Sequence, residues 1–123
     1  MKILRYLIIV FCMACWSISW AQPNSTFVFA KIADTVMPIE RGAKYEDPLD
    51  AALKQSKLGE VTGGGSALGK DKKIEWVGVD IELTDLRQGV LFVKSKLRQL
   101  GAPKGSKLEY EVNGKQVSVE IYE

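Results

Sequence analysis

The chain has 123 residues, contains no histidine, and carries 17 basic against 15 acidic side chains. Without histidine it has no Ser-His-Asp or Cys-His catalytic set, no histidine-based zinc site and no imidazole switch near neutral pH. The small positive excess comes from Lys2 and Arg5, and the chain from Gln22 onward carries 15 residues of each sign. Nucleic-acid binding needs a surplus of Lys and Arg to release counterions from phosphates, so we do not expect nucleic acid as a partner.

Residues 1–21 have the organisation of a signal peptide. Basic residues precede an uncharged apolar run at 7–16, and Ser19-Trp20-Ala21 places small residues at positions −3 and −1 of a cut before Gln22. We expect cleavage there and delivery of the remainder to the periplasm or the exterior. An uncleaved membrane anchor and a lipoprotein at Cys15 are the alternatives.

Both cysteines of the chain, Cys12 and Cys15, lie in this segment. After cleavage the domain has no disulfide, and we expect no stable membrane insertion. A domain of about 100 residues can be held together by an apolar core alone, and the sequence therefore predicts a single packed domain at 26–123.

The first half of this domain begins with a polar lead-in at residues 22–25 and a strand at 26–32 (TFVFAKI), rich in β-branched and aromatic residues. Residues 34–46 are expected to form a connecting loop. Asp47 followed by Pro48 predicts the start of a helix, with an N-cap carboxylate and proline at the first helical position. Gly59 predicts its end.

The second half contains the clearest strand of the chain, at 74–83, where alternate residues are apolar. A helix capped by Thr84 or Asp85 follows, and Gly101 ends it. Its buried stripe consists of Leu86, Val90, Val93, Leu97 and Leu100. Residues 107–112 and 115–122 alternate around Asn113-Gly114, which predicts a β-hairpin.

The predicted order of elements is β-α-β-β-α-β-β. A β-α-β-β-α-β core of this length indicates an α+β, ferredoxin-like two-layer sandwich, with an extra C-terminal strand that forms the hairpin. Both helices are expected to cover one face of the sheet and to leave the other face open.

This open face is the first candidate site, because strand alternation gives it many acidic side chains. A solvated antiparallel face is normally polar, but carboxylates spread over neighbouring strands also fit a basic protein partner. The residues expected on it are Trp76, Asp80, Glu82, Glu109, Glu111, Ser118 and Glu120.

A glycine run, Gly63, Gly64 and Gly65, is the second candidate. Residues 64–70 match G-x-x-x-x-G-K, but Asp71 follows instead of Ser or Thr and a strand follows instead of a helix, so we expect no phosphate loop and no nucleotide cofactor. Successive glycines can still expose backbone N–H groups to a ligand; a bulged or twisted edge strand is the alternative.

Carboxylates also gather at Glu46, Asp47 and Asp50, where paired acids could perform acid–base chemistry or bind calcium. Capping and the helix dipole already account for Asp47 and Asp50, and Pro48 interrupts the spacing of a calcium loop. We therefore expect no enzyme, metal or cofactor here and keep a carboxylate hydrolase as a minor alternative.

Three segments, YEDPL from Tyr45, LGEVTGGG from Leu58 and LGAPKG from Leu100, resemble a small bacterial domain of uncharacterised and immunity-type exported proteins, and the resemblance covers residues 27–122. It implies a binding role and no catalytic residues. The sequence thus leads to one hypothesis, an exported protein-binding domain such as an immunity or inhibitor protein, and one alternative, a small-ligand or carbohydrate-binding accessory domain that uses Trp76 and the glycine run. The oligomeric state stays open.

Overall fold

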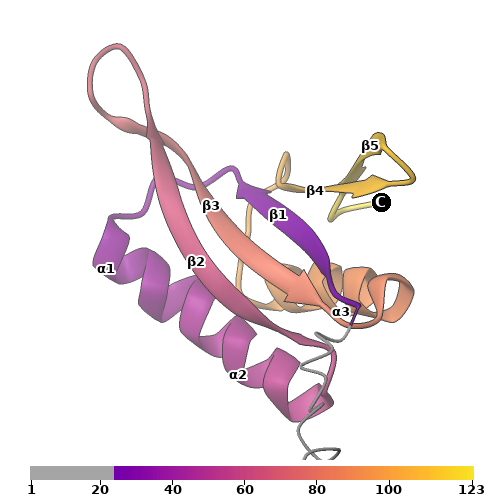
Figure 1. Cartoon of the computed structure of the whole chain (residues 1–123). Coiled ribbons are helices and arrows are strands. Elements are labelled where there is room, and N and C mark those ends of the chain that lie inside the picture. Colours follow the sequence, from indigo (N-terminus) through magenta and orange to yellow (C-terminus); the bar gives the residue numbers. More distant parts are fainter. Residues whose placement is uncertain (1–23) are drawn as a thin grey trace, which may run out of the picture.

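The computed structural model describes residues 24–123, which form a five-stranded antiparallel sheet with helices packed on one face (Figure 1). The predicted α+β class and order of elements are confirmed. The predicted signal segment, residues 1–21, lies outside the described residues. Within residues 24–123, no helix is both long enough and apolar enough to cross a membrane.

The sheet has the order β2-β3-β1-β4-β5, so β1 is central and β2 and β5 form the edges. Every neighbouring pair is antiparallel. The strands are β1 at Thr26–Ile32, β2 at Gly59–Leu68, β3 at Ile74–Leu83, β4 at Lys107–Val112 and β5 at Lys115–Glu120. The first strand has the predicted bounds, and the predicted glycine run lies inside the edge strand β2.

The first helix is longer than the sequence predicted. It begins at Pro38, continues through α1 (Pro38–Arg41), the π-helical segment η3 (Gly42–Glu46) and α2 (Asp47–Ser56), and keeps right-handed helical angles at both junctions. The expected loop at residues 34–46 is therefore wrong from Pro38 onward, and Asp47 is not an N-cap.

Pro48 explains the unusual middle of this helix. A proline inside a helix has no N–H to donate, and its ring crowds the carbonyl one turn earlier. The helix widens just before it, so that the N–H of Asp47 donates to the carbonyl of Gly42, five residues back, in the manner of a π-turn. The same dipeptide that resembles a helix start is thus accommodated in the interior of a longer helix.

The second long helix, α3 (Leu86–Gln99), follows the prediction closely. The carboxylate of Asp85 accepts a hydrogen bond from the N–H of Gln88 at 3.0 Å, as an N-cap does. Val90, Val93 and Leu97 of the predicted stripe are buried. The helix ends just before Gly101, whose φ of +89° is in the left-handed region.

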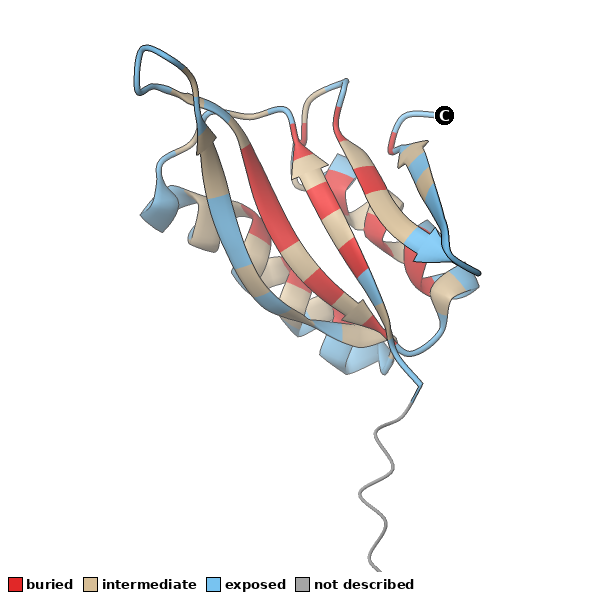
Figure 2. Ribbon diagram, turned by 45° about the horizontal axis from the view of Figure 1, so that its top comes forward, coloured by how far each residue is buried: buried red, intermediate tan, exposed pale blue. Residues whose placement is uncertain are grey.

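The core lies between the helices and one face of the sheet, and Figure 2 shows the opposite face uncovered. Alternate strand residues supply the sheet side of the core, while Tyr45, Leu49 and Leu53 supply the first helix's side. The fully buried strand residues are Val28, Ala30, Ile32, Val77, Val79, Ile81, Leu83 and Leu108. The predicted hairpin is confirmed, since β4 and β5 pair around Asn113 and Gly114, both with positive φ.

Candidate functional site

The uncovered face of the sheet is the candidate site, and we call it the open face. Strand register defines its members, because two residues that lie directly opposite each other on neighbouring strands point to the same face of the sheet. Phe27 lies opposite Glu82, and Phe29 lies between Asp80 and Glu109. The open face comprises Glu60, Gly63, Gly65 and Ala67 of β2; Trp76, Gly78, Asp80 and Glu82 of β3; Phe27, Phe29 and Lys31 of β1; Lys107, Glu109 and Glu111 of β4; and Gln116, Ser118 and Glu120 of β5.

The structure brings together most of the residues that the sequence singled out. Trp76 and the five predicted carboxylates, on β3, β4 and β5, all lie on the open face. Of the three glycines, Gly63 and Gly65 lie on this face. Gly64 instead faces the helices, because a Cβ there would come within 2.7 Å of the Glu46 carboxylate.

The sequence analysis did not assign any residue of the central strand, β1, to this face. Phe27, Phe29 and Lys31 alternate with the buried residues of β1 and therefore point away from the core. The available signal was the two-residue alternation of TFVFAKI, in which Lys31 marks the solvent side. Aromatic residues favour a strand whichever face they occupy, so their presence alone predicts the strand and not the face.

These side chains form an aromatic cluster in the middle of the open face. The rings of Phe29 and Trp76 meet edge to face, with centroids 5.9 Å apart and planes at 82°, a favourable aromatic geometry. The Lys31 ammonium lies 4.7 Å from the Trp76 ring centre, within the range of a cation–π contact. A Cβ at Gly78 would come within 2.6 Å of Cε1 of Phe29, so the glycine makes room for this ring.

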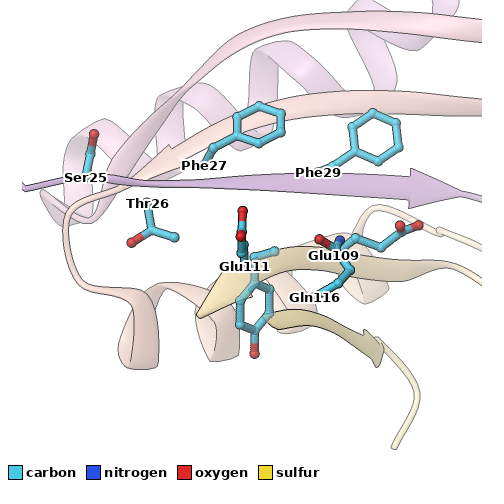
Figure 3. A pocket seen from close by; sticks show the side chains of 8 residues that line it. Ser25, Thr26, Phe27, Phe29, Glu109, Glu111 and Gln116 are labelled. Atoms are coloured by element: carbon cyan, nitrogen blue, oxygen red, sulfur yellow. The ribbon is translucent and has the colours of Figure 1, made fainter. Parts of the chain in front are cut away.

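A hollow of about 570 Å³ opens beside the cluster, between β1 and β4 (Figure 3). Pairing of these two strands stops at Val28 and Tyr110, although β4 continues with β5 to Val112. The strands separate beyond that point and leave the hollow. Its lining consists of Ser25, Thr26, Phe27, Phe29, Glu109, Tyr110, Glu111 and Gln116.

The electrostatic character of the open face is uneven. Its two basic residues, Lys31 and Lys107, lie opposite each other in the β1–β4 register. The carboxylates of Asp80, Glu82 and Glu111 lie toward the other end: Glu111 lines the hollow, and Asp80 and Glu82 lie opposite Phe29 and Phe27 on the neighbouring strand. None of the four ion pairs within residues 24–123 involves an acidic residue of this face, so these carboxylates are available to an external cation.

The other carboxylates that the sequence raised serve the packing of the first helix. Glu46 pairs with Arg41 at 2.8 Å, and the same guanidinium donates to the Ser66 hydroxyl at 2.7 Å. Asp50 accepts from the Val61 N–H at 2.9 Å and from Lys54 at 2.9 Å. These two interactions lower the pKa of Asp50. The contacts with Ser66 and Val61 tie the helix to β2, so Glu46 and Asp50 both take part in the packing of the first helix on the sheet.

No metal-binding group of three acidic or cysteine side chains occurs within residues 24–123. No protein-family model, curated protein or solved structure matches the chain.

Proposed function

We propose that this protein is an exported, non-enzymatic protein-binding domain, of the kind that serves as an immunity or inhibitor protein, and that it binds its partner through the open face. The observation that carries the proposal is an aromatic cluster on the central strands, bordered by carboxylates that form no ion pair with any other described residue. Export by the segment at residues 1–21 is part of the same proposal.

The composition of the open face supports a protein partner. Phe27 remains 48% exposed, and aromatic side chains are the residues that protein interfaces concentrate at their centres. Unpaired carboxylates around such a centre would steer a basic surface toward it and oppose the approach of an acidic one. We therefore expect a partner that presents basic residues around an apolar patch.

The strand order supports a finer assignment of the fold. In the order β2-β3-β1-β4, each helical connection joins two strands that have a third strand between them. This is the arrangement of a split β-α-β unit. We assign the domain to the ferredoxin-like sandwiches, with β5 as an addition at one edge.

The hollow beside Phe27 and Phe29 supports a second candidate, a small-ligand or carbohydrate-binding accessory domain. A volume of about 570 Å³ lies within the usual range of ligand pockets. Aromatic rings next to carboxylates and an amide could stack on a sugar and accept its hydroxyl hydrogen bonds. A ligand in this hollow would change the fluorescence of Trp76 through the neighbouring ring of Phe29.

The test is capture of the partner by the full chain, expressed in its native host with a C-terminal tag, crosslinked, and analysed by mass spectrometry. We expect one dominant protein at a fixed stoichiometry. The double variant Glu82→Lys/Glu111→Lys should lose that protein. The control Glu40→Lys/Asp47→Lys also reverses two negative charges, at exposed positions of the first helix, and should still capture the partner protein.

Equal capture by both variants would contradict a role for the open face. Failure to capture any protein, together with a Trp76 fluorescence change in a panel of sugars and small molecules, would replace the protein-binding proposal by the ligand-binding one.

A further inference from the structure

A second exposed surface lies at the end of the β2–β3 hairpin, away from the hollow of the open face. These two strands are longer than β1, whose pairing with β3 ends at Ile32 and Val77. The hairpin therefore extends past the central strand and protrudes beyond the helices (Figure 1). The residues beside and within this protruding end, here called the hairpin-end patch, are Met37, Ile39, Leu68, Lys70, Lys72 and Lys73.

The patch exposes large apolar side chains. Met37 is 63% exposed, Leu68 61% and Ile39 91%. Met37 and Leu68 line a shallow, largely apolar groove of about 740 Å³, whose other walls are Thr35, Pro38, Ser66, Lys72, Lys73 and Ile74. Leaving such side chains in water is unfavourable, so the groove is suited to an apolar occupant.

The charged residues that line this groove are basic, while two carboxylates lie near it: Asp71 in the same turn, and Glu75, whose side chain lies beside Gly69. Lys72 and Lys73 are the only charged residues in its lining, and Lys70 belongs to the same turn. The carboxylate of Asp71 accepts from the Lys73 N–H at 3.0 Å and so helps to fix the turn. None of the ion pairs found in residues 24–123 uses these three lysines. The occupant should therefore combine an apolar part with negative charge.

The composition of the patch separates two anionic occupants, a lipid surface and an acidic protein. Protein interfaces are enriched in aromatic residues and Arg and depleted in Lys, and the patch contains neither an aromatic residue nor Arg. Aliphatic side chains flanked by lysines are instead the combination that binds the boundary between acyl chains and anionic headgroups. We propose that the hairpin-end patch docks the domain on an anionic lipid surface, with Met37, Ile39 and Leu68 entering the headgroup region.

The proposal can be tested by co-sedimentation of the full chain with vesicles of phosphatidylcholine alone or with phosphatidylglycerol. We expect preference for the anionic vesicles and weaker binding at high salt. Each lysine at such a surface contributes about five-fold in partition coefficient, so Lys70→Gln/Lys72→Gln/Lys73→Gln should lower the partition coefficient about a hundred-fold. The control Lys57→Gln/Lys104→Gln/Lys115→Gln changes three exposed lysines elsewhere and should bind as the wild type does. All variants share residues 1–21, so any contribution of that segment to vesicle binding is the same in each and cancels when the variants are compared.

A second variant separates the apolar contribution. Met37→Ser/Leu68→Ser replaces exposed side chains, so its circular dichroism should be unchanged, yet its binding to both kinds of vesicle should fall. Equal binding by the patch and control lysine variants would overturn the proposal. Binding of the wild type to polyglutamate but not to anionic vesicles would also overturn it, in favour of an acidic protein.

Discussion

The contact most open to a quantitative test is the buried hydrogen bond of Tyr45. This side chain is fully buried, and its hydroxyl donates to the carboxylate of Asp34 at 2.5 Å. The same carboxylate accepts from the Lys44 ammonium at 2.9 Å. Tyr45→Phe removes one donor and leaves the ring in place. Hydrogen bonds to charged groups contribute about 1.5–3 kcal/mol, so we expect the free energy of unfolding at pH 7 to fall by roughly that amount.

The pH dependence of this loss distinguishes the hydrogen bond from a packing effect. Burial and then the bond to Asp34 raise the pKa of Tyr45 from 10.0 to about 12. The folded state therefore holds this proton more tightly, and the associated stability is complete below pH 10 and is lost as the pH rises toward 12. By pH 11 the loss is roughly 1.4 kcal/mol. Phenylalanine has no proton to lose, so the difference between wild type and Tyr45→Phe should shrink by that amount.

Urea unfolding followed by tryptophan fluorescence at pH 7, 9, 10 and 11 measures this difference directly. Lysines away from Tyr45 titrate alike in both proteins, so their effect on the difference largely cancels. Asp34 and then Tyr45 raise the pKa of Lys44, so its titration shrinks the difference in the same direction. A difference that stays constant from pH 7 to pH 11 would refute the reasoning, as would equal stability of the two proteins at pH 7.

Two further predictions concern close packing. Gly64→Ala should be about 1 kcal/mol less stable than Gly65→Ala in urea unfolding, because its Cβ would displace the Glu46 carboxylate, whereas nothing lies within 4 Å of a Cβ at Gly65; equal stabilities would argue against the close approach. Ser106 is buried, and its hydroxyl accepts from the Ala33 N–H at 2.9 Å, so Ser106→Ala should cost about 1–3 kcal/mol by leaving that donor unpaired. An unchanged melting temperature would contradict this role for Ser106.

The parts of the fold that could be predicted are those in which local chemistry and tertiary packing agree. Asp85 caps α3 where the sequence places a cap, and Asn113-Gly114 turns between two alternating strands. The first helix could not be delimited in the same way. Asp47-Pro48 has the local chemistry of a helix start, but Tyr45 and Leu49 pack together in the core, and their burial favours a continuous helix with a widened turn.

The sequence predicted the acidic residues of the candidate site. It did not predict that Phe27 and Phe29 lie at the centre of the same face. Acidic residues in alternation can be assigned to a solvent face with some safety, because burying them is costly. Phe27 and Phe29 have the opposite preference, and Lys31 is the single residue of this strand pattern that marks their side as the solvent side. Pairing with β3 and β4 and the complete burial of Val28 and Ala30 agree with that one signal.

The two proposed surfaces have opposite chemistry, and their separation along the strands allows both to work at once. At about 3.3 Å per residue, Lys73 and Glu82 lie roughly 30 Å apart along β3. The Debye length at physiological ionic strength is about 8 Å, so an anionic surface that attracts the lysines would barely repel carboxylates at the far end. A domain docked by its hairpin end would thus still present the acidic part of the open face to a basic partner. The formal neutrality of the chain after Gln22 is consistent with this arrangement, because local surfaces and not the net charge determine what each end binds.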